Sequence, residues 1–142
     1  MAPAFTLRAA TWSADQKALQ AVRIPVFVVE QKVDASEEFD DVDLVCQHVL
    51  AVDVQGTPIG TGRIDSHGKI GRMAVAADWR KHGVGFAILD KALEIARSKG
   101  LNRVYLHAQL SAVGFYERAG FSGYGDHFFE AGIEHLAMGR SL

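Results

Sequence analysis

The chain has 142 residues, 49% of them hydrophobic, and its 15 basic and 17 acidic residues leave a formal net charge of −2. A chain of this length forms one ordinary domain with a substantial core, so we expect a single domain over residues 1–142. The slightly acidic balance gives no overall basic field for nucleic acid, and no apolar run approaches the roughly 20 residues that cross a bilayer. Neither nucleic acid nor a membrane is therefore expected as a partner.

Cys46 is the single cysteine of the chain and cannot form an internal disulfide. It lies in an apolar run, LVCQHVLAV, where core packing is its expected role. The first residues do not combine a basic region with an apolar stretch, as a secretion signal does. We therefore expect a reduced, cytoplasmic protein.

The N-terminal stretch predicts an edge strand and then a helix. Residues 5–9 suit a strand. Ser13 and Gln16 have the S-x-x-Q spacing of a capping box, so the helix should begin near Ser13. Pro25 interrupts the apolar-periodic segment that follows. Because a proline inside a helix costs roughly 3 kcal/mol, we expect the helix to end or kink near Ile24.

Residues 30–43 are strongly acidic, with seven carboxylates against the single Lys32. One interpretation is a solvated, mobile loop. Another is that part of the run borders a binding site and attracts a cationic amine, because clustered carboxylates raise the local concentration of positive substrates. Both interpretations are open at this point, and Glu30, beside the apolar VFVV stretch, stands apart from the run.

An antiparallel meander follows, because the turn sequences QGTP (55–58) and DSHGK (65–69) separate three apolar runs. The three predicted strands are residues 44–54, 59–64 and 70–76.

A long helix is the best-marked element. Its apolar positions recur at helical spacing, and they are Val84, Ile88, Leu89, Ala92, Leu93 and Ala96. Arg97 and Lys99 complement the negative end of the helix dipole, and Gly100 suits a left-handed cap.

The remaining elements are short. A strand at 104–108 should lie parallel to its neighbour because the helix forms the crossover. A short helix at 112–119 ends at Gly120, and two strands near 121–124 and 134–138 should pair.

The loop before the long helix, RKHGVG (80–85), is a candidate anion site. The first N–H groups of a helix lack intrahelical partners and the dipole is positive there, so helix N-termini bind phosphate. Gly83 and Gly85 remove the side chains that would hold a pyrophosphate away, and three residues add charge: Arg80, Lys81 and His82. Taken alone, such a loop can also be an ordinary turn.

Two phosphate motifs do not fit this loop. The P-loop signature GxxxxGK[ST] is absent, and Ile88 stands where the dinucleotide fingerprint needs its third glycine. The loop instead resembles the acyl-coenzyme A site of the GNAT superfamily of N-acetyltransferases, in which an Arg-x-x-Gly-x-Gly loop follows an apolar strand. QLSAVGFYERAGF (109–121) resembles the closing motif of that family, with Gln109 at the usual Asn position. Four segments resemble its ElaA/YjcF-like branch: VFVVEQ (26–31), IGRMAV (70–75), HAQLSAVGFYERAGF (107–121) and FFEAGIEHLAM (128–138).

The resemblance implies an α+β (mixed α/β) fold in one domain, with a central, mostly antiparallel sheet, a parallel pair at its middle and flanking helices. It implies N-acetyltransferase activity with acetyl-coenzyme A as co-substrate, and a strand at 73–75 that pairs with the pantetheine arm. The residues implied in cofactor binding are Met73, Ala74, Val75, Arg80, Lys81, His82, Gly83, Val84, Gly85, Phe86 and Gln109.

Amide formation from a thioester needs a neutral amine, a polarised carbonyl and a proton for the departing thiolate. A lysine-like amine titrates near about 10.4, so it must first lose a proton, and Glu30 is the candidate base. The alternative for Glu30 is a surface ion pair. A backbone N–H of residues 73–75 suits the developing oxyanion. Tyr116 is the candidate acid through its match to the Phe-Tyr motif, and its alternative is a core aromatic with a satisfied hydroxyl.

No metal site is expected, because no pair of histidines has helical ligand spacing around a glutamate and there is no cysteine cluster. His48, His107 and His135 lie in strand-like runs, where one ring nitrogen of each should satisfy a neighbour. The leading hypothesis is direct transfer, in a ternary complex, to a primary amine of a small molecule or peptide. The alternative is a non-catalytic module that binds coenzyme A or regulates a partner. Exposed strand edges favour a homodimer.

Overall fold

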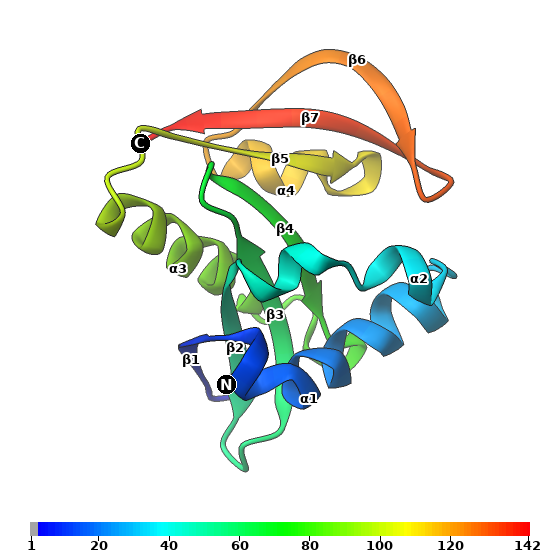
Figure 1. Ribbon diagram of the computed structural model, residues 1–142, viewed down its shortest axis with the longest axis vertical. Coiled ribbons are helices and arrows are strands. Elements are labelled where there is room, and N and C mark those ends of the chain that lie inside the picture. The colour runs from blue at the N-terminus through cyan, green and yellow to red at the C-terminus, as the bar shows by residue number, and fades with distance from the viewer. Residues whose placement is uncertain (1–2) are drawn as a thin grey trace.

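The computed structural model describes residues 3–142, which form one seven-stranded sheet with helices on both faces (Figure 1). The strands are β1 (Phe5–Ala10), β2 (Gln47–Asp53), β3 (Pro58–Ile64), β4 (Lys69–Val75), β5 (Arg103–Gln109), β6 (Ser122–Glu130) and β7 (Ile133–Ser141). The α-helices are α1 (Trp12–Arg23), α2 (Ala35–Glu38), α3 (Val84–Ser98) and α4 (Val113–Arg118). A π-helix, η1 (Ile24–Glu30), and three 3₁₀ turns, η2 (Asp41–Leu44), η3 (Ala77–Trp79) and η4 (Leu110–Ala112), link them.

The sheet has the order β1-β2-β3-β4-β5-β7-β6, and only the central neighbours β4 and β5 run parallel. The predicted mixed fold with a parallel pair at its middle is therefore confirmed. That pair holds for two positions, Lys69 opposite Tyr105 and Ile70 opposite Leu106. Beyond them β4 and β5 separate, and Figure 1 shows β5, β7 and β6 running across the top while β4 and β3 descend. The sheet is thus open between its two halves.

Helix α3 packs on one face of the sheet through the predicted apolar positions, all of which are buried. Val49 and Ala51 of β2 belong to the α3 cluster, whereas Leu50 between them packs with Leu19 of α1. Because successive strand residues point to opposite faces, α1 and α3 cover opposite sides of the sheet. The helix lies close to β3, since a Cβ added at Gly60 would be 2.7 Å from the Ile88 side chain.

The start of α1 differs from the prediction. Thr11, not Ser13, is the N-cap, and its hydroxyl accepts a hydrogen bond from the Ala14 N–H at 3.3 Å. Asp15 accepts in return from the Thr11 N–H at 3.1 Å. Because the helix begins earlier, Trp12 is part of it and packs in the buried cluster under α1. The spacing of the polar residues Ser13 and Gln16 could not indicate this packing. The end of α1 at Arg23, where η1 with Pro25 begins, confirms the predicted break.

The acidic run is not one solvated loop, so that interpretation is wrong for part of it. Residues 35–38 and 41–44 are helical, and Glu38 and Asp43 are 2% and 1% exposed. Both carboxylates pair with Arg23, itself 1% exposed: its Nε lies 2.8 Å from Glu38 and its Nη1 2.8 Å from Asp43. Arg63 and Arg72 join the same network. The run therefore folds over cations supplied from α1, β3 and β4.

The other predicted elements are found within a few residues of their expected limits. The first meander strand begins at Gln47 rather than at 44, because residues 41–44 form η2. β6 and β7 are longer than predicted, at nine residues each. None of the helices within residues 3–142 is long and apolar enough to cross a bilayer.

Candidate active site

The N-terminus of α3 presents unpaired backbone donors. Gly83 is the N-cap in the left-handed region, with φ 83°, and it contributes no side-chain cap. The first intrahelical bond runs from the Ala87 N–H to the Gly83 carbonyl at 3.1 Å, so the N–H groups of the three preceding residues have no intrahelical acceptor. At Gly85 an added Cβ would lie 3.3 Å from the Phe115 ring, so this glycine also lets α4 approach α3 closely.

The edge of β4 beyond its short pairing with β5 is open. The Ala76 N–H bonds to Ile59 of β3 at 2.8 Å. Because N–H groups alternate in direction along a regular strand, that of Val75 points the other way, toward the separation from β5. The Val75 carbonyl confirms this direction, since it accepts from Arg80 Nε at 3.2 Å on that side. Further back along β4 this alternation is interrupted, because the register with β3 shifts opposite Arg72 and Met73, and because Arg72 has a φ of 50°.

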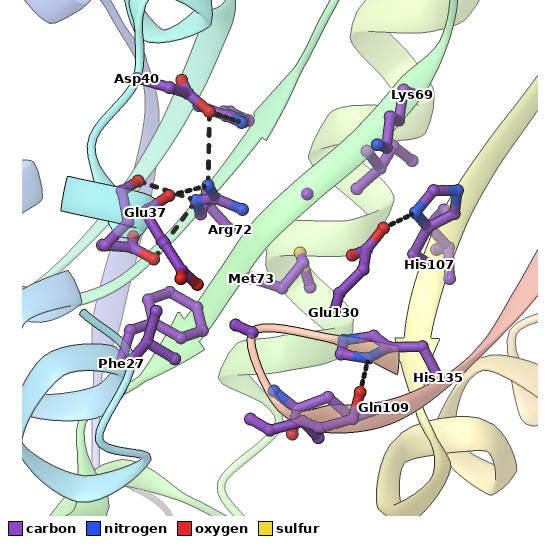
Figure 2. A pocket seen from close by; sticks show the side chains of 18 of the residues that line it. Phe27, Glu37, Asp40, Lys69, Arg72, Met73, His107, Gln109, Glu130 and His135 are labelled. Carbon is purple, nitrogen blue, oxygen red and sulfur yellow. Dashed lines mark hydrogen bonds and ion pairs between the residues drawn. The ribbon is translucent and has the colours of Figure 1, made fainter. Parts of the chain in front are cut away.

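A cavity of about 590 Å³ fills the separation between β4 and β5 (Figure 2). Its walls come from β4 and β5, the β6–β7 turn, the end of η1 and α2. Three of the predicted site residues line it: Met73, Gln109 and Tyr116. Gln109 Nε2 donates to Gln31 Oε1 at 2.8 Å, which ties β5 to the end of η1. The other predicted residues, in the loop before α3 and at Ala74, Val75 and Glu30, lie outside the lining of this cavity.

Tyr116 projects from α4 into the cavity lining and is 9% exposed. Its ring packs edge-on against Phe115 and Phe121, with centroids 5.0 and 5.8 Å apart. Within residues 3–142 its hydroxyl makes no hydrogen bond. Every fully buried polar side-chain atom in that range does have a partner, so the hydroxyl cannot be fully buried. Because Tyr116 lines the cavity, its hydroxyl is reached from there. Burial raises the pKa of Tyr116 to about 12. The phenol therefore keeps its proton at neutral pH, as an acid must.

Glu30 does not occupy the position expected of a base. It forms a two-pronged ion pair with Arg80, with Oε1 and Oε2 at 2.7 and 3.0 Å from the guanidinium nitrogens, and both side chains are nearly half exposed. The hydrogen bond and charge of Arg80 hold the pKa of Glu30 below its usual value. A paired carboxylate of lowered pKa is a weak proton acceptor, so the structure favours the alternative, a surface ion pair.

A Glu30→Gln variant should consequently retain activity. We expect kcat/KM for the acetyl transfer that the resemblance implies to change by less than about fivefold, because an exposed ion pair contributes little and a carboxylate held by Arg80 is a weak proton acceptor. Steady-state assays of free thiol release at neutral pH measure the change. A loss of two orders of magnitude or more would restore Glu30 as the base.

The predicted histidine contacts are confirmed, but two of these residues also belong to the site. His48 bonds to the Asp43 carbonyl at 2.9 Å beneath the acidic run. His107 Nδ1 lies 2.6 Å from Glu130, and His135 Nδ1 lies 2.6 Å from the Ile133 carbonyl. His107, Glu130 and His135 all line the cavity. No spacing within one segment marks these three residues as neighbours, because they come from three different strands, β5, β6 and β7. Among residues 3–142 no cluster of three or more His, Cys, Asp or Glu side chains is arranged to hold a metal.

Comparison with known proteins gives a family for this geometry. The model of the acetyltransferase (GNAT) domain matches residues 17–142. The uncharacterized N-acetyltransferase YjcF of Bacillus subtilis is 40% identical over 122 residues, which cover 82% of this chain and 86% of the relative. A solved acyl-CoA N-acyltransferase from Pseudomonas aeruginosa superimposes with a TM-score of 0.86 at 29% identity, covering 96% of this chain and 99% of the other. Escherichia coli ElaA does so with a TM-score of 0.84 at 27% identity and the same coverage. The chain therefore belongs to the GNAT family of acetyltransferases, and within it to the ElaA/YjcF-like branch.

Proposed function

We propose that the protein transfers an acetyl group from acetyl-coenzyme A to a primary amine of a small molecule or peptide, directly and within a ternary complex. The observation that carries the proposal is the separation of β4 from β5 after two residue pairs. This opening exposes a strand edge to one substrate and leads into a cavity for the other.

Residues around α3 fit the charged end of coenzyme A. The free N–H groups after Gly83 and the positive end of the dipole suit a pyrophosphate, and Lys81 adds a cation at the same loop. The open edge of β4 suits the amide groups of the pantetheine arm, because strand edges pair with extended amide chains. The N–H group of Val75 then points to where the thioester carbonyl would lie, and such a fixed donor stabilises a developing oxyanion.

The cavity supports the remaining steps. An amine held there beside the thioester reacts as a positioned pair, so no covalent enzyme intermediate is needed. Tyr116, which faces the cavity with its proton in place, would protonate the departing thiolate. We also propose that the reaction takes place in the cytoplasm, because a single buried, free cysteine suits a reducing compartment.

The pyrophosphate site is tested by replacing Gly83 with valine. A β-branched residue strongly disfavours φ 83°, so the turn should change and redirect the donors at the start of α3. We expect the affinity for coenzyme A, measured by calorimetry, to fall at least about tenfold, or ~1.4 kcal/mol. Gly56 is the matched control, because it also has a left-handed φ of 84° and open space around it. Gly56→Val should lower stability without changing that affinity, and equal losses in the two variants would contradict the proposed site.

A screen of acceptors tests the activity itself. The full chain is incubated with acetyl-coenzyme A and lysine-like amines, polyamines, amine-bearing antibiotics or peptides with free N-termini, and thiol release is followed. Transfer to at least one amine is the expected result. Binding of coenzyme A without transfer to any amine would indicate a non-catalytic module. Absence of binding would reject both functions.

A further inference from the structure

His135 is part of the cavity wall. In the β5–β7 pair it stands directly opposite Gln109, so both side chains are on the same face of the sheet. It lines the cavity, yet the residue as a whole is only 8% exposed. Figure 2 shows its ring beside Gln109, on the side of the cavity opposite Phe27 and Glu37. A buried imidazole therefore borders the opening that the two substrates would share.

The contacts of His135 fix the state of its ring. Its Nδ1 lies 2.6 Å from the Ile133 carbonyl, and a carbonyl oxygen can only accept, so Nδ1 carries the proton. In the neutral ring Nε2 then has a free lone pair. Over the described chain Nε2 makes no hydrogen bond. Every fully buried polar side-chain atom there has a partner, so Nε2 is not fully buried, and since His135 lines the cavity, Nε2 is open to it. Phe128 stacks on the ring at 5.9 Å and 22°, which holds its orientation.

The other titratable side chains of this wall are less suited to accept a proton. His107 and Glu130 are paired with each other at 2.6 Å, so each already uses one of its polar atoms. Tyr116 keeps its proton because burial raises its pKa to about 12. Lys69, at the β4 side, is a cation that can only donate. The carboxylates elsewhere in the lining differ from it: Glu38 and Asp40 pair with arginines, Asp65 accepts from the backbone N–H of Lys69, and Glu37 is exposed. Among the described residues that line the cavity, His135 is the one that combines burial, a fixed ring and an open acceptor atom.

We propose that His135 Nε2 is the proton acceptor for the amine, a proposal that rests on the acetyltransferase function above. The acceptor enters as an ammonium ion and gives one proton to Nε2, which later releases it to water. The neutral nitrogen forms the new C–N bond as the C–S bond breaks, and sulfur leaves with the electron pair. Sulfur takes the Tyr116 proton, and the second nitrogen proton restores Tyr116 through water. The Ile133 carbonyl stabilises the imidazolium through Nδ1.

The ring state can be tested without any acceptor. In the ¹⁵N-labelled full chain, long-range nitrogen–proton spectra of the neutral ring should show His135 with a protonated Nδ1 and an unprotonated Nε2. His135→Gln identifies the resonance, and loss of the Nδ1 proton would be expected only on unfolding. The opposite tautomer would overturn the proposal, because no lone pair would then face the cavity.

The kinetic test uses two small acceptors, methylamine and hydroxylamine, at high concentration and corrected for the uncatalysed reaction. Methylamine is protonated at neutral pH and needs a base, whereas hydroxylamine is neutral and does not. We expect His135→Gln to slow transfer to methylamine by about 10²- to 10⁴-fold and transfer to hydroxylamine by less than about fivefold. His127→Gln, at an exposed histidine that does not line the cavity, should leave both rates unchanged.

A pH profile separates a base from a merely structural residue. The acid limb of kcat/KM for methylamine should disappear in His135→Gln and persist in His107→Gln. This result is expected although other titratable or charged residues also line the cavity: Glu37, Glu38, Asp40, Cys46, Arg63, Asp65, Lys69, Arg72, Tyr116 and Glu130. Equal slowing of both acceptors with an unchanged profile would show a structural role and reject the base. Failure of the unmodified protein to use either acceptor, or any amine in the screen, would instead reject the acetyltransferase function and this proposal with it.

Discussion

Replacing Tyr116 with phenylalanine should lower kcat by about 10²- to 10⁴-fold, because the variant would lack the proposed proton donor for the departing thiolate. Affinity for coenzyme A should stay within about twofold, since no charge is lost and the ring that packs against Phe115 and Phe121 is retained. Thiol release in steady state measures the first effect, and calorimetry measures the second. A split between turnover and affinity is the signature of a group used in the transition state.

Tyr124→Phe is the matched control, because it removes a phenolic hydroxyl from an exposed position on β6, outside the cavity. It should not change kcat. The pH dependence gives a second check: since the pKa of Tyr116 is raised to about 12, its hydroxyl stays protonated across neutral pH and adds no basic limb there. Unchanged turnover in Tyr116→Phe would leave the tyrosine as a core aromatic, the alternative that its burial alone suggests.

The parts of this fold that could be predicted carry local signals. The apolar stripe along α3, the left-handed Gly100 after its end and the end of α1 before Pro25 each depend on a few neighbouring residues. Capping, periodicity and proline geometry act over one or two turns, so a sequence states them directly. The family motifs added the placement of Gln109 and Tyr116, both of which line the cavity.

The parts that could not be predicted depend on partners far away in the sequence. Glu30 pairs with Arg80, fifty residues along the chain, and this contact changes it from a candidate base to half of an ion pair. His135 gains its significance from Gln109 on another strand and from the separation of β4 and β5. No spacing rule within one segment encodes a cavity that several segments enclose. Charge alone also could not show which carboxylates of the acidic run are buried.

Replacing Arg23 with methionine should destabilise the protein by about 3–5 kcal/mol, because Glu38 and Asp43 would be left as buried charges without their principal partner. That is a large share of the roughly 5–15 kcal/mol by which a domain is stable. The side chain also lies between Trp12 and Phe39, with its guanidinium carbon 5.2 and 5.1 Å from their ring centroids. Urea denaturation at neutral pH measures the change. Arg8→Met, which breaks the exposed pair with Asp15, is the control and should cost no more than about 1 kcal/mol.

The cause of the Arg23 effect can be separated from simple loss of packing. Burial pushes the pKa of Asp43 upward, but the hydrogen bonds and charges of Arg23 and Arg63 outweigh it and hold this pKa below its usual value. The contribution of Asp43 is therefore fully present above its unfolded pKa of about 3.9 and is lost as pH falls through the lower folded value. Without Arg23 the buried carboxyl can lose its charge by protonation, so the loss of stability in Arg23→Met should shrink as pH falls from neutral toward about 4.

Adding Glu38→Gln and Asp43→Asn to Arg23→Met should recover part of the lost stability at neutral pH. A deficit that does not change with pH and is not relieved by those changes would assign it to packing against Trp12 and Phe39. The residues of the acidic run that line the cavity, Glu37, Glu38 and Asp40, would then owe their position to aromatic contacts and not to buried charge.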